Sequence, residues 1–234
     1  MGCSRKEVEE KKTFFVVDPK TAGGVSGSVR YAGAKVNAVV IDMDQDPECV
    51  RLYPEGPRKE QTVVVNPDGT LGNVFIYVKS GLEGKSFESP KVPVTIDQKG
   101  CWFQPRVLGM QAGQTLQVTN SDPVTHNIHP MAQVNREWNQ SQAPQETPIL
   151  RRFAKPELMI PVKCNVHKWM RAWVGVLDHP YFAVTGKDGS FELKNVPPGS
   201  YTVAAWHEKL GLKIEAVTIV VGAKQNVNFN FNGE

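Results

Sequence analysis

Three side chains that can bind a metal lie close together in the second half of this 234-residue chain: Cys164, His167 and Met170. Their spacing, Cys-x-x-His-x-x-Met, puts a thiolate, an imidazole and a thioether on one short segment. His126 follows an apolar-alternating segment at residues 115–119 and can supply a second imidazole. Two His and one Cys form a trigonal plane, a thioether is a weak axial ligand, and soft sulfur ligands select copper over harder divalent ions. The pattern therefore predicts one mononuclear copper site.

A zinc site is the alternative at this position, because His129 adds a third imidazole close to His126. Four tetrahedral zinc ligands would then be Cys164, His126, His129 and His167. On an extended strand, however, His126 and His129 point to opposite faces because side chains alternate along a strand. We therefore expect His129 to lie outside the ligand set.

These residues resemble the cupredoxins, the small blue copper proteins, over residues 100–178. The resemblance rests on the string MQAGQTLQVTNSD at residues 110–122, on His126 with Asn127, and on the 164–170 segment. That segment is similar to the short ligand loop of the amicyanin branch. The resemblance implies a Greek-key β-sandwich with one type 1 copper held by His126, Cys164, His167 and Met170. It also implies that the side chain of Asn127 ties the two ligand loops together.

Electron transfer between Cu(I) and Cu(II), without catalysis, is the function that this resemblance implies. The expected partners are redox proteins, such as a cytochrome or a membrane electron-transfer complex. In cupredoxins the His of the Cys loop, here His167, exposes its ring edge within an apolar docking patch. Pro130, Met131 and Trp169 are the residues expected to form that patch, and a place in the core is the alternative for Trp169.

Two other function classes remain open. One is a non-redox structural or docking subunit of a bacterial envelope electron-transfer complex, with an empty or zinc-filled site. The other is an enzyme such as a copper oxidase or a nitrite reductase, which needs a further copper with an open coordination position. The remaining histidines provide no recognisable second cluster for that copper: His129, His179 and His207. We therefore expect a protein that is not an enzyme.

Composition excludes other classes of partner. Charged residues make up 22% of the chain and the formal net charge is only +3, so no basic surface for nucleic acid is expected. No apolar run approaches the roughly 20 residues that a membrane-spanning helix needs.

The cysteines point to a location outside the cytoplasm. Cys49 and Cys101 lie at the edges of strand-like segments and are expected to be bridged in an oxidising compartment; two unpaired buried thiols are the alternative. Gly2-Cys3-Ser4 resembles the end of a bacterial lipobox. We expect a lipid anchor at Cys3, residues 1–20 as a flexible tether, and a periplasmic or extracytoplasmic domain attached to a bacterial membrane. An unmodified Cys in a tail is the alternative.

Turn signals divide the chain into short strand-like segments, which predicts an all-β fold. Residues 66–69 (Asn-Pro-Asp-Gly) and 197–199 (Pro-Pro-Gly) are two of these signals. Residues 227–231 alternate between apolar and Asn side chains, as expected of a half-buried antiparallel strand. Only residues 135–153 lack strand character, and we expect a long loop there, beside the copper site.

Residues 181–232 resemble a second family, the carboxypeptidase regulatory-like domains, which are small transthyretin-like β-sandwiches without catalytic residues. The strings VTGKDGSF and VPPGSYTV, which begin at Val184 and Val196, carry this resemblance. The opening strand of such a domain is similar to residues 24–31. We therefore expect a discontinuous sandwich built from residues 22–44 and 181–232, with the cupredoxin-like domain inserted at residues 45–178. The alternative is that the N-terminal strands extend the cupredoxin sheet.

Overall fold

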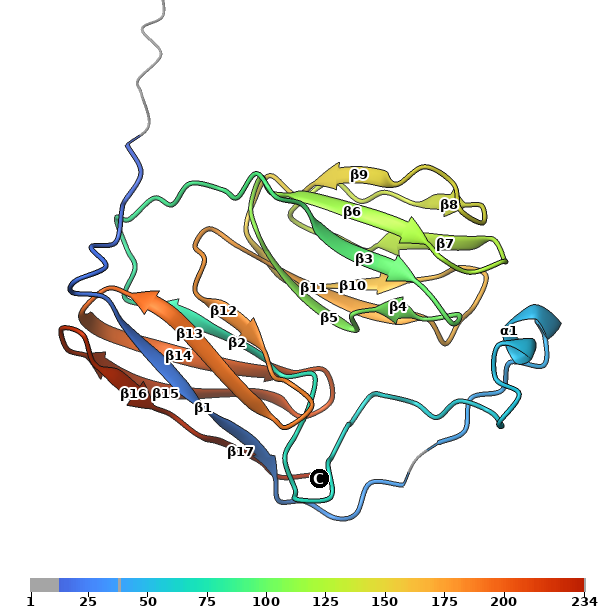
Figure 1. Cartoon of the computed structure of the whole chain (residues 1–234), viewed down its shortest axis with the longest axis horizontal. Coiled ribbons are helices and arrows are strands. Elements are labelled where there is room, and N and C mark those ends of the chain that lie inside the picture. Colours follow the sequence, from blue (N-terminus) through green and yellow to red (C-terminus); the bar gives the residue numbers. More distant parts are fainter. Residues whose placement is uncertain (1–12, 38, 234) are drawn as a thin grey trace, which may run out of the picture.

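The computed structural model describes residues 13–37 and 39–233, and these residues form two β-sandwiches that lie side by side (Figure 1). The predicted all-β fold is confirmed, with one short helix, α1 (Pro47–Arg51), in the described ranges. The predicted anchor at Cys3 and the first part of the tether lie outside the described residues. None of the described helical residues belongs to a segment long and apolar enough to span a membrane.

The first sandwich contains the candidate ligands. One of its sheets has the strand order β4 (Phe103–Gln104), β3 (Val94–Gln98), β6 (Thr115–Asn120) and β9 (Ile149–Arg152). The other has the order β5 (Val107–Gln111), β11 (Arg171–Leu177), β10 (Glu157–Lys163), β7 (His126–Pro130) and β8 (Gln140–Gln142).

Each sheet of this sandwich contains one parallel strand pair, β3 with β6 in the first sheet and β5 with β11 in the second. The neighbouring pairs, such as β10 with β11 and β6 with β9, are antiparallel. The chain crosses from one sheet to the other repeatedly, for example between β5 and β6 and again between β6 and β7. Alternation along β6 directs Leu116, Val118 and Asn120 into the interior, while the residues between them are half-buried. The apolar residues between the two sheets form one continuous core that also contains Cys164 and Met170.

Residues 135–153 do not form the single long loop expected from their composition. They include β8 and β9, and β8 pairs with β7 such that Gln142 lies opposite His126. Gln142 is completely buried, and its side-chain amide donates to the carbonyl groups of Val118 and Thr147. A polar residue thus occupies a strand because its hydrogen bonds are satisfied inside the sandwich, and composition alone does not reveal this.

The second sandwich combines strands from three parts of the chain. In one layer, β1 (Gly23–Tyr31) pairs with β13 (Ser190–Val196), β16 (Lys224–Asn226) and β17 (Phe229–Phe231). The other layer has the order β12 (Phe182–Val184), β2 (Phe75–Ser80), β14 (Gly199–His207) and β15 (Gly211–Ile219). Val227, Phe229 and Phe231 are buried as the alternation predicts. The pairing prediction was wrong, because β17 runs parallel to β1.

β2 also differs from its predicted place. The range 45–178 assigned Phe75–Ser80 to the copper-binding domain, whereas β2 pairs with β12 and β14 of the second sandwich. Alternating apolar residues identify a strand, but they do not identify the sheet that the strand joins. The chain therefore enters the second sandwich at β1, leaves it through α1, returns at β2, and only then forms the first sandwich (Figure 1).

A close contact joins the two sandwiches. Gly109 and Gly175 face each other on β5 and β11, and a Cβ atom on either would lie within 2.8 Å of the Phe75 ring. Their lack of side chains lets this aromatic residue of β2 pack against the first sandwich. At the edge of the contact, the buried Arg106 guanidinium forms a bidentate ion pair with Glu208, at 2.5 and 2.9 Å. A bidentate pair fixes orientation as well as distance, so the two sandwiches are held in one arrangement.

Candidate metal centre

The candidate ligands come from three strand ends of the first sandwich. His126 begins β7, Cys164 follows β10, and Met170 immediately precedes β11. The segment between Cys164 and Met170 is closed by two backbone hydrogen bonds, from the Cys164 amide to the Met170 carbonyl at 3.2 Å and from the Met170 amide to the His167 carbonyl at 3.0 Å. All four side chains are at most 2% exposed. The adjacent β-strands thus position a short, buried ligand loop.

The sequence-predicted ligands His126, Cys164 and His167 converge in the structure. The two Nδ1 atoms of the imidazoles lie 3.0 Å apart, and the Cys164 Sγ atom lies 3.9 Å from the Nδ1 atom of His167. The three ligand atoms all lie within 4.8 Å of one another. First-row metal ions bind imidazole nitrogen and thiolate sulfur at about 2.0–2.3 Å, so this spacing suits one ion bonded to all three. Met170 lies in the same core cluster as Cys164.

The outer nitrogen of each imidazole is bonded to a carboxylate. The His126 Nε2–H group donates to Asp122 at 2.8 Å, and the His167 Nε2–H group donates to Asp46 at 2.8 Å. These bonds assign the proton to Nε2 in both rings, which leaves the facing Nδ1 atoms as lone-pair donors. Carboxylates in this position orient metal-binding imidazoles and raise their basicity.

Sequence reasoning missed both carboxylates. Asp122 is buried and also accepts the backbone amides of Gly100 and Cys101, at 2.6 and 2.7 Å. Asp46 is the N-cap of α1 and reaches a histidine 121 positions away. Asp46 and Asp122 each precede a proline in the sequence, which marks a turn or a helix start, but nothing local relates them to a metal centre.

The hydrogen bonds within the cluster favour a thiolate at Cys164 and raise the proton affinity of the two imidazoles. Burial raises the pKa of the Cys164 thiol, but hydrogen bonds with His126 and His167 outweigh burial and lower the pKa to about 6. Burial lowers the pKa of each imidazole, but the bonded carboxylate and Cys164 together raise it above its ordinary value. A metal ion takes the place of the protons at such a cluster.

Two further hydrogen bonds hold the ligand loop in place. The backbone amide of His167 donates to the Cys164 Sγ atom at 3.3 Å. The side-chain oxygen of Asn127 accepts the backbone amide of Asn165 at 3.1 Å. The role expected for Asn127, a link between the two ligand loops, is confirmed. These bonds act before any metal arrives, so the site is largely preformed.

His129 lies outside this cluster. Its Nε2 atom bonds the Glu137 carboxylate, and its Nδ1 atom lies 3.4 Å from the side-chain oxygen of Asn165. The tetrahedral zinc site that includes His129 is therefore not assembled. His129 is excluded because side chains alternate along β7: His126 is completely buried, whereas His129 is only partly buried.

The expected exposed edge of His167 is absent, which corrects the predicted docking patch. The ring of His167 is only 2% exposed, because Asp46 and the Cys49 side chain cover its Nε2 atom. Cys49 and Cys101 form a disulfide, as predicted. Met131, expected on the rim of the site, lies at the opposite end of β7 from His126 and lines a cavity between the two sandwiches.

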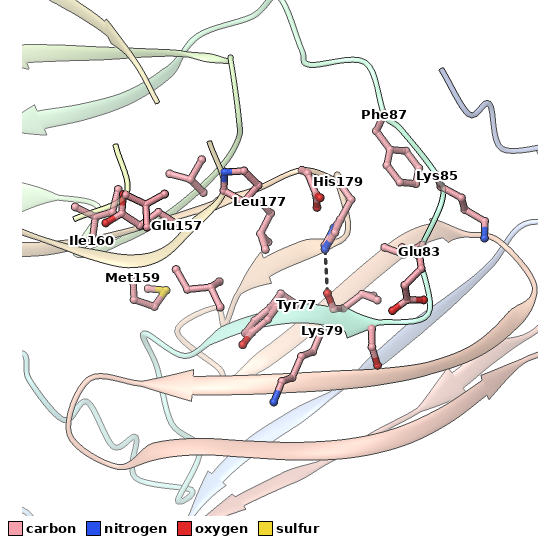
Figure 2. A pocket seen from close by; sticks show the side chains of 18 of the residues that line it. Tyr77, Lys79, Glu83, Lys85, Phe87, Glu157, Met159, Ile160, Leu177 and His179 are labelled. Atoms are coloured by element: carbon pink, nitrogen blue, oxygen red, sulfur yellow. Dashed lines mark hydrogen bonds between the residues drawn. The ribbon is translucent and has the colours of Figure 1, made fainter. Parts of the chain in front are cut away.

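That cavity has a volume of about 910 Å³ and is separate from the metal cluster. Figure 2 shows Tyr77 and His179 on one side and Met159 and Ile160 on the other. The Nε2–H group of His179 donates to the Val78 carbonyl at 2.9 Å, and its Nδ1 atom accepts the amide of Tyr181. Both ring nitrogens are therefore committed to the backbone, and His179 is not available as a ligand.

Comparisons with known proteins find one family model and several solved structures that are similar to part of this chain. Residues 180–231 match the family model of the second β-sandwich domain of NOMO1-like subunits of the BOS complex. This confirms a β-sandwich in the region that resembled the carboxypeptidase regulatory-like domains. A search of curated proteins found no match.

Among solved structures, a mutant of amicyanin in its Cu(I) form is 20% identical, with 43% of this chain and 97% of that chain covered and a TM-score of 0.32. A purple cupredoxin from Nitrosopumilus maritimus is 20% identical over 36% of this chain and 98% of that chain, with a TM-score of 0.31. The copper nitrite reductase of Thermus scotoductus SA-01 is 22% identical over 43% of this chain, with a TM-score of 0.35, and the match spans a quarter of that chain.

Strand pairing and ligand order identify the first sandwich. One sheet contains the parallel β3–β6 pair and the other contains the parallel β5–β11 pair. With His126 at the start of β7 and Cys164, His167 and Met170 between β10 and β11, the two sheets form a cupredoxin-like sandwich. The described part of the chain thus consists of a cupredoxin-like sandwich and a second sandwich that contains the NOMO1-like segment.

Proposed function

We propose that this chain is a type 1 copper protein that carries electrons outside the cytoplasm. The observation that supports this most strongly is the convergence of His126 Nδ1, His167 Nδ1 and Cys164 Sγ within 4.8 Å in the buried interior of the first sandwich. Two imidazole nitrogens and one thiolate, with the Met170 thioether in the same buried core, would favour copper over zinc, magnesium or calcium. Bound copper would supply a one-electron couple between Cu(I) and Cu(II).

The protein's own residues would limit the movement that accompanies electron transfer. Asp122 and Asp46 fix the two imidazole rings, and the His167 amide and Asn127 fix the loop around Cys164. Ligands held this firmly change little when the charge of the ion changes. A small structural change on oxidation lowers the barrier to electron exchange.

A carrier fits the burial of the site better than an enzyme does. Catalysis at copper needs a coordination position that a substrate can reach, whereas His126, Cys164 and His167 are each at most 2% exposed. Among the described residues, the other groups of metal-capable side chains share His126 or His167 with this site. They offer no independent centre of the kind that a nitrite reductase requires.

The proposal also includes a compartment and a class of partner. The Cys49–Cys101 disulfide indicates folding in an oxidising environment such as the bacterial periplasm. The proposed partners are redox proteins, a cytochrome or a membrane electron-transfer complex. A structural or docking subunit with zinc at the same ligands is the competing proposal, which metal analysis separates.

The test is copper loading of the metal-free protein followed by metal analysis, visible spectroscopy and voltammetry. We expect one copper per chain, an intense colour in the oxidised form because of thiolate-to-Cu(II) charge transfer, and a reversible one-electron wave. His126→Ala should alter the spectrum by removing one of the two imidazole nitrogens that would bind the copper. His129→Ala is the matched control and should leave the spectrum unchanged, since His129 bonds Glu137 instead. Stoichiometric zinc in protein purified from its native source, with no colour after copper loading, would contradict the proposal.

A further inference from the structure

A structural cap lies over the outer edge of His167. It consists of Asp46 and α1, which lie on a long excursion that the chain makes between β1 and β2 (Figure 1), and of the disulfide that joins Cys49 of α1 to Cys101 in the β3–β4 turn. Asp46 contributes both of its oxygens. Oδ1 accepts the backbone amides of Glu48 and Cys49, at 3.0 and 3.2 Å, while Oδ2 accepts His167 Nε2–H at 2.8 Å. One carboxylate thus begins the helix and holds the imidazole.

The cap is fastened to the first sandwich on its other side. Cys49 is completely buried, and its Sγ atom lies 3.7 Å from the Nε2 atom of His167. The disulfide joins it to Cys101, whose amide bonds Asp122, the partner of His126. The Trp169 indole donates to the Cys101 carbonyl at 3.1 Å. The carboxylate partners of the two imidazoles are therefore linked through one disulfide.

We infer that Asp46 is a positioning residue, which fixes the His167 ring with Nδ1 toward the metal site and closes the outer ring edge to solvent and to partner proteins. This deepens the proposed function and rests on it, because it removes the His167 edge as the direct contact point for a redox partner. The hydrogen bond from Nε2–H is what orients the ring. The disulfide keeps its acceptor in place although Asp46 is 121 residues away in sequence.

A purely structural role, as the N-cap of α1, is the competing explanation for Asp46. Asp46→Ser separates the two roles, because Ser is a good N-cap but is too short to reach His167. Asp46→Asn removes the charge and leaves one side-chain oxygen, which can accept the α1 amides or the His167 Nε2–H group but not both. Glu48→Gln is the matched control, since Glu48 lies in the first turn of α1 and pairs with Arg51 at the surface.

The first experiment measures the acylation rate of His167 by diethyl pyrocarbonate in metal-free protein with an intact disulfide, using peptide mass spectrometry. We expect slow acylation in the unmodified chain and in Glu48→Gln, and a rate in Asp46→Asn that lies between theirs and that of Asp46→Ser. Asp46→Ser should raise the rate roughly tenfold or more, as loss of a charge-assisted hydrogen bond predicts. Equal protection of His167 in Asp46→Ser would overturn the inference.

The second experiment uses copper-loaded protein and measures the reduction potential and the rate of Cu(I) removal by a chelator. Loss of the negative charge should raise the potential in both Asp46 variants, because a carboxylate stabilises Cu(II) more than Cu(I). Copper release should be fastest in Asp46→Ser, since the ring there has no side-chain tether. An unchanged potential and release rate in Asp46→Ser would overturn the inference. Failure of the unmodified chain to bind copper would instead refute the proposed function, while the acylation rates of metal-free protein would still test the cap.

Discussion

Histidines are buried in both sandwiches, but their partners differ. In the cupredoxin-like sandwich, His126 and His167 each bond a carboxylate, and their pKa values are raised although burial acts to lower them. In the second sandwich, His179 and His207 bond backbone groups, and burial lowers their pKa values, to about 4 for His207. The difference distinguishes imidazoles prepared to bind a cation from imidazoles that serve as neutral parts of a core.

Removal of the thiolate should produce the largest change in the first region. Cys164→Ser replaces the sulfur that supplies the charge-transfer transition, so we expect complete loss of the visible band of the copper-loaded protein. The His126 and His167 rings would remain in place on their carboxylates. Absorption spectroscopy at equal copper loading measures this, and a band of undiminished intensity would show that Cys164 is not a ligand.

The disulfide holds the cap on the first sandwich, and its loss should cost the most in stability. Cys49 and Cys101 are 52 residues apart, and a closed loop of this size stabilises the fold by about 4 kcal/mol in the chain-entropy model. We expect the Cys49→Ser, Cys101→Ser double variant to lose about that much free energy of unfolding in urea titrations. Thiol counting on denatured, metal-free protein that carries no lipid should detect Cys164 and Cys3 only; four reactive thiols would show that Cys49 and Cys101 are not bridged.

The neutral state of His207 predicts a pH effect in the second region. Its folded pKa of about 4 lies below the ordinary value of 6.5, so the unfolded chain takes up the proton first as pH falls. The stability that His207 contributes is complete above pH 6.5 and is lost between pH 6.5 and 4, by up to about 3 kcal/mol.

His207→Asn tests this prediction, because Asn does not titrate and its oxygen can still accept the Lys209 and Leu210 amides. Urea unfolding of metal-free protein at pH 7.5 and pH 4.5 should show a smaller loss of stability in the variant than in the unmodified chain. Equal losses in both proteins would show that His207 titrates normally when folded, and the contrast between the two sandwiches would fail.

The axial ligand should give the smallest effect. Met170→Leu keeps the buried volume and the backbone bonds of the ligand loop but removes the thioether. We expect copper to stay bound and the reduction potential to rise, because an axial thioether tunes the potential without dominating affinity. Voltammetry measures the shift, and loss of copper binding would show that Met170 contributes more than an axial contact.

Local sequence predicted the ligand cluster, because three of its members lie within seven residues and the fourth begins a strand. Local sequence could not predict Asp46, since its bond to His167 depends on a disulfide and on an excursion of the chain between two strands of the other sandwich. The same limit applies to β2, whose alternation is compatible with either sandwich. Contacts between segments far apart in the sequence decide which histidine Asp46 bonds and which sheet β2 joins. The spacing of apolar residues along the sequence carries no information about such contacts.

Copper X-ray absorption spectroscopy on the loaded protein, in both oxidation states, tests directly whether His126, Cys164 and His167 bind one copper in a preformed site. We predict one thiolate sulfur and two imidazole nitrogens around the ion, with bond lengths that change little on reduction, because carboxylates and backbone amides already hold these ligands. Copper surrounded only by nitrogen and oxygen, or a ligand set that is unaffected by Cys164→Ser, would contradict this.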